Sequence, residues 1–161
     1  MKKVQVAVIG YGVIGKRVAG AVALQEDMEL AGVADVISDW RIKAAVDKGY
    51  TVYAATAEAR QNMEQAGISV AGNMDDLLEK ANIAVDCTPK KIAAQNVETY
   101  KKQGLKFILQ GGEKHEVTGH SFSAKKQLRF DPKPGKHPGG VLQHYFHSAN
   151  AHRAEEGRAV A

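Results

Sequence analysis

The feature that most constrains this 161-residue sequence is an apolar, strand-like run that leads directly into the pattern Gly-x-Gly-x-x-Gly. The run is Val4–Ile9, and Gly10, Gly12 and Gly15 open a segment of helical character. In βαβ units that bind dinucleotides, the first glycine permits a tight turn, the second lets backbone approach a pyrophosphate and the third allows close helix packing. The N–H groups and the dipole at the helix start then favour the phosphates. The pattern therefore predicts a dinucleotide site at this loop.

An acidic residue follows the glycine pattern at the distance expected for a ribose ligand. Glu29–Asp35 has the composition of a second strand, with Asp35 at its end. A carboxylate at this position can accept hydrogen bonds from both ribose hydroxyls of NAD, and it repels the 2′-phosphate of NADP. We therefore predict that Asp35 binds the ribose and favours NAD, with NADP as the second candidate. The alternative is a solvated turn residue, or the cap of a helix that begins near Asp39.

Strand and helix patterns alternate along the chain up to about Gly112. This alternation predicts an α/β fold, a Rossmann-like, doubly wound parallel sheet with helices on both faces, in which ligands bind at the carboxyl ends of the strands. After the glycine loop, we expect strands near 29–35, 51–54, 68–71, 83–87 and 106–110, and helices near 39–48, 57–66, 74–80 and 93–103.

Composition divides the chain into a body, residues 1–124, and a tail, residues 125–161. The tail carries seven of the 22 basic and three of the 18 acidic residues, so the body is balanced and the net charge of +4 comes from the tail. Three of the four prolines and four of the six histidines also lie there. We expect a disordered tail after one nucleotide-binding domain, and no nucleic-acid partner, because a neutral body does not make a basic binding face.

Other global properties favour a cytoplasmic protein. The sequence has no apolar run near 20 residues and its start does not resemble a signal peptide, so we expect no membrane partner. A single cysteine excludes an internal disulfide framework and suits a reducing compartment. The histidines of the tail have no regular zinc-site spacing with a cysteine, so we expect no metal site.

Several residues at the expected carboxyl ends have two interpretations each. Cys87 is a nucleophile or a small buried thiol, and its apolar strand favours the buried thiol. Thr88 and Pro89 are expected to shape a loop near the cofactor. Gly111 belongs to a plain turn or to a backbone pair that touches the nicotinamide ribose. His115 is a general base or a solvated loop histidine, and its charged neighbours favour the second interpretation.

The motifs Gly10–Val18, Asp86–Pro89 and Gln110–Glu116, taken in order, closely resemble archaeal-type (type II) phosphorylating glyceraldehyde-3-phosphate dehydrogenase. Two intervening segments, 48–50 and 66–72, and the stretch from 119 to 122 resemble the same family. The resemblance covers residues 3 to about 124. It is more specific than the glycine loop alone, because several motifs occur in the same order.

The resemblance implies an enzyme of glycolysis and gluconeogenesis that oxidises glyceraldehyde 3-phosphate with NAD or NADP and phosphate, typically as a homotetramer. A cysteine attacks the aldehyde, hydride passes to nicotinamide and phosphate releases the thioester. Carried over by motif, Val13 and Ile14 contact the pyrophosphate with the loop glycines, and Gly111 lies along the nicotinamide. Relatives often have basic residues after the second strand, where this chain has Ala34-Asp35-Val36, which favours NAD.

The chain departs from the family in one major respect. The family's nucleophile lies in a Ser-Cys-Asn-Thr-Thr motif that this sequence lacks, and the substrate domain is missing as well. Cys87 belongs to a different motif and cannot replace the nucleophile. We therefore expect no catalytic residue here, and a cofactor-binding fragment that is inactive alone.

The tail suggests how such a fragment could arise. Codons can be chosen for His137–Phe146 so that a one-base shift reads Thr-Arg-Val-Val-Ser-Cys-Asn-Thr-Thr, the family's catalytic segment. Our hypothesis is out-of-frame translation from about residue 125 onward. The alternative is a non-catalytic dinucleotide-binding module with a genuine basic tail that binds anions or metal. A runner-up family, dihydrodipicolinate reductase, shares the glycine loop, but its signatures are not visible between Gly111 and Phe122.

Overall fold

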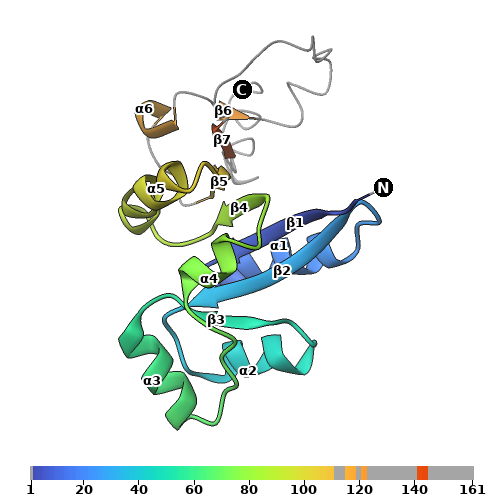
Figure 1. Ribbon diagram of the computed structural model, residues 1–161, viewed down its shortest axis with the longest axis vertical. Helices are drawn as coiled ribbons and strands as arrows, with labels where there is room; N and C mark the ends of the chain where they lie inside the picture. The colour runs from blue at the N-terminus through green and yellow to red at the C-terminus, as the bar shows by residue number, and fades with distance from the viewer. Residues whose placement is uncertain (1, 111–114, 119–120, 123–140, 145–161) are drawn as a thin grey trace, which may run out of the picture.

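The computed structural model describes residues 2–110, 115–118, 121–122 and 141–144 of the chain (Figure 1). The strands form one sheet in the order β3-β2-β1-β4-β5-β7-β6, and every neighbouring pair is parallel. This arrangement confirms the predicted α/β, Rossmann-like fold. The strands are β1 (Val4–Ile9), β2 (Met28–Asp35), β3 (Val52–Ala54), β4 (Ile83–Asp86), β5 (Lys106–Leu109), β6 (Ser121–Phe122) and β7 (Val141–His144).

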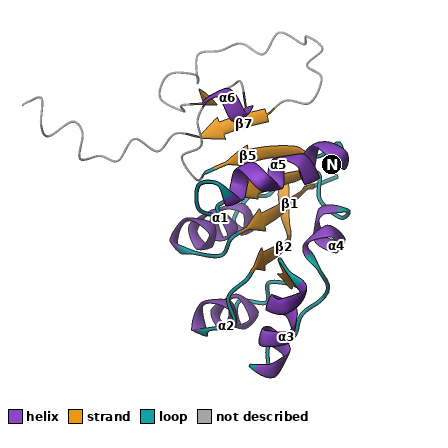
Figure 2. Cartoon of the chain, turned by 90° about the vertical axis from the view of Figure 1, so that its left-hand side faces the viewer, coloured by secondary structure: helices purple, strands orange, loops and turns teal. Residues whose placement is uncertain are grey.

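Helices cover both faces of the sheet, as Figure 2 shows for α1 and α2 on one side of the strands and α4 on the other. Alternation along β1 explains the two faces: Val8 packs with the α1 and α2 side, and Ile9 with the α4 and α5 side. The helices are α1 (Val13–Ala23), α2 (Trp40–Asp47), α3 (Ala57–Gln65), α4 (Met74–Leu78), α5 (Ile92–Lys102) and α6 (His115–Thr118).

Side-chain caps fix the start of three of these helices. Asp39 accepts a hydrogen bond from the backbone of Arg41 at α2, and Thr56 accepts one from the backbone of Ala59 at α3. At α4 the direction is reversed, since the carboxylate of Asp76 accepts from the N–H of Asn73 at 2.7 Å. Such contacts satisfy the N–H groups that a helix start leaves without partners. They set the boundaries of α2, α3 and α4 close to those expected from the sequence.

Two segments differ from the expectation. Residues 68–71 are not a strand, although the N–H of Ala71 donates to the carbonyl of Val52 and the N–H of Ala54 donates to that of Gly72. The chain therefore runs beside β3 for too short a distance to continue the sheet. Val141–His144, within the tail expected to be disordered, forms β7 and pairs with β5, whose edge offers backbone groups to a further strand. The rest of the tail lies outside the described residues.

Candidate functional site

The carboxyl ends of β1, β2, β4 and β5 meet at one edge of the sheet. Strand order reverses there, because the chain leaves β1 towards β2 on one side and returns to β4 on the other. In open parallel sheets, ligands bind in the crevice at such a reversal point. The loops that follow these strands begin at residues 10, 36, 87 and 110, so the structure brings together most of the predicted site residues.

Gly10 and Gly15 pack the glycine loop tightly. Gly10 has φ +85°, and a Cβ there would lie 2.9 Å from the backbone nitrogen of Thr88. At Gly15 a Cβ would lie 1.9 Å from the carbonyl oxygen of Gly10, which side chains do not tolerate. Both positions therefore require glycine, the first for a left-handed turn and close contact, the second for contact between α1 and the loop.

Gly12 has a different surrounding. It is the N-cap residue of α1, and a Cβ added to it would meet no atom within 4 Å. No side chain caps this helix, and Val13 and Ile14, which follow, are 72% and 39% exposed. The start of α1 thus has open space beside Gly12, no side-chain cap and two exposed apolar side chains directly after it. This is the arrangement that a pyrophosphate requires.

The Asp35 carboxylate lies at the end of β2 and holds the glycine loop. Its Oδ2 accepts from the N–H of Tyr11 at 2.5 Å, and its Oδ1 accepts from the N–H groups of Val36 and Ile37 at 2.7 and 3.2 Å. A carboxylate offers about four lone-pair positions. Among the described residues three are used, which leaves one position open.

Charged and aromatic side chains meet at the start of α2, a short distance along the chain from Asp35. The guanidinium of Arg41 binds the carboxylate of Asp39, with 2.6 Å between Nη2 and Oδ2. The ammonium of Lys16, from α1, lies 4.2 Å from the ring centre of Trp40, which is 69% exposed. The sequence analysis did not predict that Asp39 holds Arg41, the first basic residue after Asp35.

Asp86, at the end of β4, is a fully buried carboxylate that the sequence analysis gave no role. Its Oδ1 accepts from the N–H and the hydroxyl of Thr88 at 2.9 and 2.5 Å. Its Oδ2 accepts from the amide of Asn96 and the hydroxyl of Tyr100, both on α5, at 2.9 and 2.7 Å. Burial and the nearby Asp86 charge raise the pKa of Tyr100. Asp86 therefore joins α5 to the loop that contacts Gly10.

The remaining candidates show different positions. Cys87 is half-buried, and burial followed by the charge of Asp86 raises the pKa of its thiol to about 12, as expected for an inert thiol. Pro89 is exposed, and its carbonyl accepts from the N–H of Ile92 at 3.1 Å at the start of α5. Gly111 lies outside the described residues. His115 begins α6, and its side chain is also outside what is described.

Tyr11 attaches the glycine loop to the buried core. Its ring is 1% exposed and packs edge-on against Tyr50, with 6.4 Å between ring centres. Burial, together with Tyr50, raises the pKa of its hydroxyl. An aromatic residue between two loop glycines was visible in the sequence, but periodicity does not indicate whether such a side chain points inward.

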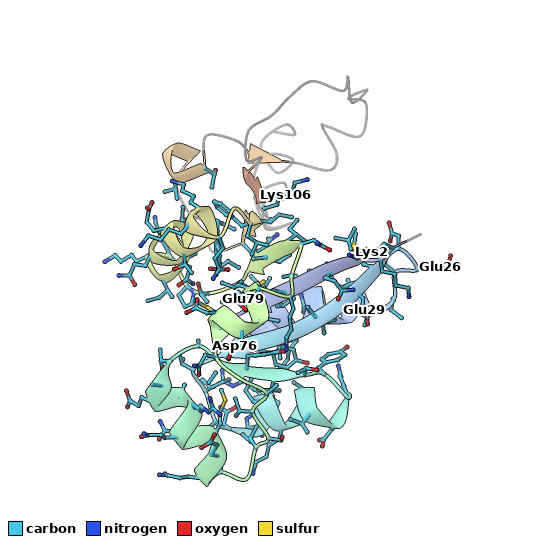
Figure 3. All side chains as sticks on the ribbon, in the orientation of Figure 1. Lys2, Glu26, Glu29, Asp76, Glu79 and Lys106 are labelled. Atoms are coloured by element: carbon cyan, nitrogen blue, oxygen red, sulfur yellow. The ribbon has the colours of Figure 1, made fainter. Side chains whose placement is uncertain are left out.

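The opposite edge of the sheet carries charges of both signs. Figure 3 labels Lys2 and Lys106 next to the starts of β1 and β5, and Glu26 and Glu29 by the start of β2. The described residues contain no group of three side chains suited to a metal ion, and no described helix is long and apolar enough to cross a membrane.

Comparisons with known proteins agree with this geometry. The family described as "Dihydrodipicolinate reductase, N-terminus" matches residues 4–112. Glyceraldehyde-3-phosphate dehydrogenase of Methanothermus fervidus is 50% identical over 119 residues, which is 74% of this chain and 35% of that protein. The enzymes of the same name from Methanococcoides burtonii and Archaeoglobus fulgidus are 47% and 50% identical over 136 and 137 residues. These alignments cover 84% of this chain and 40% and 39% of those proteins.

The chain thus spans only about two fifths of the curated relatives it matches. Among solved structures, GenD2 from gentamicin A biosynthesis in complex with NAD has a TM-score of 0.57 at 18% identity, over 99% of this chain and 40% of that one. Myo-inositol 2-dehydrogenase from Lactobacillus plantarum has a TM-score of 0.56 at 15% identity, over 96% and 40%. At such identity the likeness concerns the fold alone.

Proposed function

Since this chain belongs to the family of dihydrodipicolinate reductase N-terminal domains, we propose that it is the cofactor-binding unit of a dehydrogenase and binds NAD in preference to NADP. The 50% sequence identity to archaeal glyceraldehyde-3-phosphate dehydrogenases supports descent from that enzyme. The geometry at Gly12 carries the proposal, because open space meets the start of α1 at the position where the motif requires a pyrophosphate.

The residues present fit the cofactor at both described parts of the crevice. The N–H groups at Val13 and Ile14 would hold the pyrophosphate, and the remaining lone pair of Asp35 would accept from the adenine ribose. Thr88 and Pro89 would border the same loop, and Gly111 is proposed beside the nicotinamide. The bound nicotinamide would supply hydride acceptance, while this chain binds and orients it.

The oxidation of glyceraldehyde 3-phosphate is proposed for the full-length, cytoplasmic family enzyme and not for these 161 residues alone. The sequence contains no Ser-Cys-Asn-Thr-Thr motif, and the family's reaction needs the nucleophile in it. We therefore expect no NADH formation above background when the protein is mixed with glyceraldehyde 3-phosphate, NAD and phosphate. Turnover that depends on the protein would show that another residue acts as the nucleophile.

The test of the cofactor site is Gly12→Val. Its φ of −75° accepts any side chain and its surroundings are open, so the fold should persist while the added methyl groups occupy the pyrophosphate position. Gly20→Val is the matched control, because Gly20 is also open but lies within α1, away from the crevice. Binding can be followed by the fluorescence of Trp40, the single tryptophan.

We expect NAD to change the Trp40 signal of the wild type and of Gly20→Val, and not that of a folded Gly12→Val. Circular dichroism checks the fold of each variant. Equal NAD affinity in Gly12→Val and the wild type would contradict the proposed site.

A further inference from the structure

The carboxylate of Asp39 accepts hydrogen bonds from both the backbone N–H and the guanidinium of Arg41. Its Oδ1 accepts from the backbone N–H of Arg41 at 2.9 Å, which caps α2. The guanidinium of Arg41 then folds back onto the same carboxylate, with Nε 3.1 and 3.0 Å from Oδ1 and Oδ2 and Nη2 2.6 Å from Oδ2. One acidic side chain thus sets both the helix start and the position of the cation.

The stability of the fold does not explain this pair. The side chains of Arg41 and Asp39 are 39% and 40% exposed, and ion pairs at such exposure contribute little to folding. The contacts nevertheless favour the charged form of both groups: hydrogen bonds from Arg41 lower the pKa of Asp39, and hydrogen bonds to Asp39 raise the pKa of Arg41. The ion pair is therefore well formed but adds little stability beyond the helix cap that Asp39 supplies.

The location of the Asp39–Arg41 pair bears on how the 2′-phosphate of NADP could bind. The charge of Asp35 also raises the pKa of Arg41. The guanidinium therefore lies within the electrostatic field of Asp35, the residue predicted to bind the ribose. In this fold an arginine near that acidic position is the group that accommodates a 2′-phosphate. The ammonium of Lys16 lies 4.2 Å from the ring centre of Trp40, and its charge adds to the lowering of the Asp39 pKa that Arg41 causes.

We propose that Asp39 determines cofactor specificity by holding Arg41, so that the guanidinium does not bind the 2′-phosphate of NADP. Asp35 then disfavours the 2′-phosphate by charge repulsion. Asp39 disfavours it by binding the guanidinium of Arg41, the cation that would otherwise pair with the phosphate. This inference rests on the proposed function, since it concerns the adenosine end of the same site. It assigns a specificity role to a residue outside the glycine loop and the end of β2.

The test is Asp39→Ser, because serine keeps an oxygen at the helix cap and removes the charge that binds Arg41. Four ligands separate the effects: NAD, NADP, AMP and adenosine 2′,5′-bisphosphate, each titrated against Trp40 fluorescence. We expect affinity for the two ligands with a 2′-phosphate to rise about tenfold, as for a new charge-assisted arginine–phosphate contact. Affinity for NAD and AMP should stay within about twofold.

The double variant Asp39→Ser/Arg41→Gln should lose this gain, and added salt should reduce it. Glu64→Gln is the matched control, because Arg60 and Glu64 form an exposed pair of the same kind on α3 at 2.9 Å. An unchanged NADP-to-NAD ratio in Asp39→Ser, or a gain that persists in the double variant, overturns the inference while NAD binding stands. Failure of the wild type to bind all four ligands contradicts the proposed function, and the inference with it.

Discussion

At the scale of single residues, Asp35 serves the loop and the predicted ligand at once. Its hydrogen bonds to Tyr11, Val36 and Ile37 fix the turn after β2 against the glycine loop. In the proposed complex, the lone-pair position that remains would accept from a ribose hydroxyl. Because three N–H groups hold the carboxylate, its negative charge stays at the end of β2, where we propose that the ribose binds.

Asp35→Ala should narrow the difference between the two cofactors. A carboxylate beside a 2′-phosphate disfavours NADP by about one to three kcal/mol, or roughly five- to 150-fold in affinity. The variant removes this repulsion and also the ribose acceptor, so NAD should weaken while NADP strengthens. Isothermal titration with both cofactors measures the change, with Asp47→Ala, an exposed acid on α2, as the charge-matched control. A wild type that prefers NADP would mean that Asp35 does not face the ribose.

Cys87 gives a prediction for pH. Burial raises its pKa in the folded protein to about 12, above the ordinary thiol value of 9.0, so the folded protein keeps the proton to higher pH than the unfolded chain does. The contribution is fully present below pH 9 and is lost as pH rises towards 12, at up to about 1.4 kcal/mol per pH unit. Urea denaturation should therefore show the wild type losing stability faster than Cys87→Ala above pH 9. Rapid alkylation of the native thiol at pH 8 would contradict this.

At the scale of elements, α5 and β4 are joined through Asp86, which also holds the loop that packs on Gly10. Tyr100 contributes the hydroxyl that reaches Asp86 from the helix, and its ring lies 5.3 Å from that of Phe107. Aromatic packing would persist in Tyr100→Phe, so that change isolates the hydrogen bond. The position of the loop at Thr88 thus depends on α5, which lies far along the sequence from the glycine motif.

Tyr100→Phe should destabilise the protein by about 1–3 kcal/mol, because a buried carboxylate loses a donor. Denaturant unfolding measures this loss. Tyr50→Phe is the control, since the described residues give its hydroxyl no hydrogen bond. Equal stability of Tyr100→Phe and the wild type would show that Asp86 does not need this contact.

The same scale shows what the sequence can predict. Alternating patterns located β2, α2 and α3 because each depends on local composition and caps. Residues 68–71 were wrongly expected to be a strand, since β-branched composition does not reveal a partner edge. The Asp86 network and the Asp39–Arg41 pair escaped prediction for a related reason. Both depend on side-chain geometry that appears only after the elements pack or cap.

At the scale of the whole molecule, the described core belongs to the body. The buried clusters are formed by side chains between Val6 and Leu109, with Val117 packed against one of them. β7 adds three backbone pairings to the edge at β5. The described buried clusters of the sheet from β3 to β5 therefore draw their side chains from the body.

Limited proteolysis should trim the chain to about residue 122 and leave the body intact. In the tail, Pro132, Pro134, Pro138 and the pair Gly139-Gly140 interrupt regular patterns, and its sequence offers little apolar periodicity for packing. β7 pairs with only three residues of β5 and two of β6, and so short a pairing opens at low free energy, so it should not protect the links on either side of it. Mass spectrometry identifies the surviving fragment, and NAD titration of the isolated fragment should match that of the full chain. A stable fragment that retains Val141–His144 would contradict this expectation, and it would mean that β7 remains paired with β5 and that the tail belongs to the folded unit.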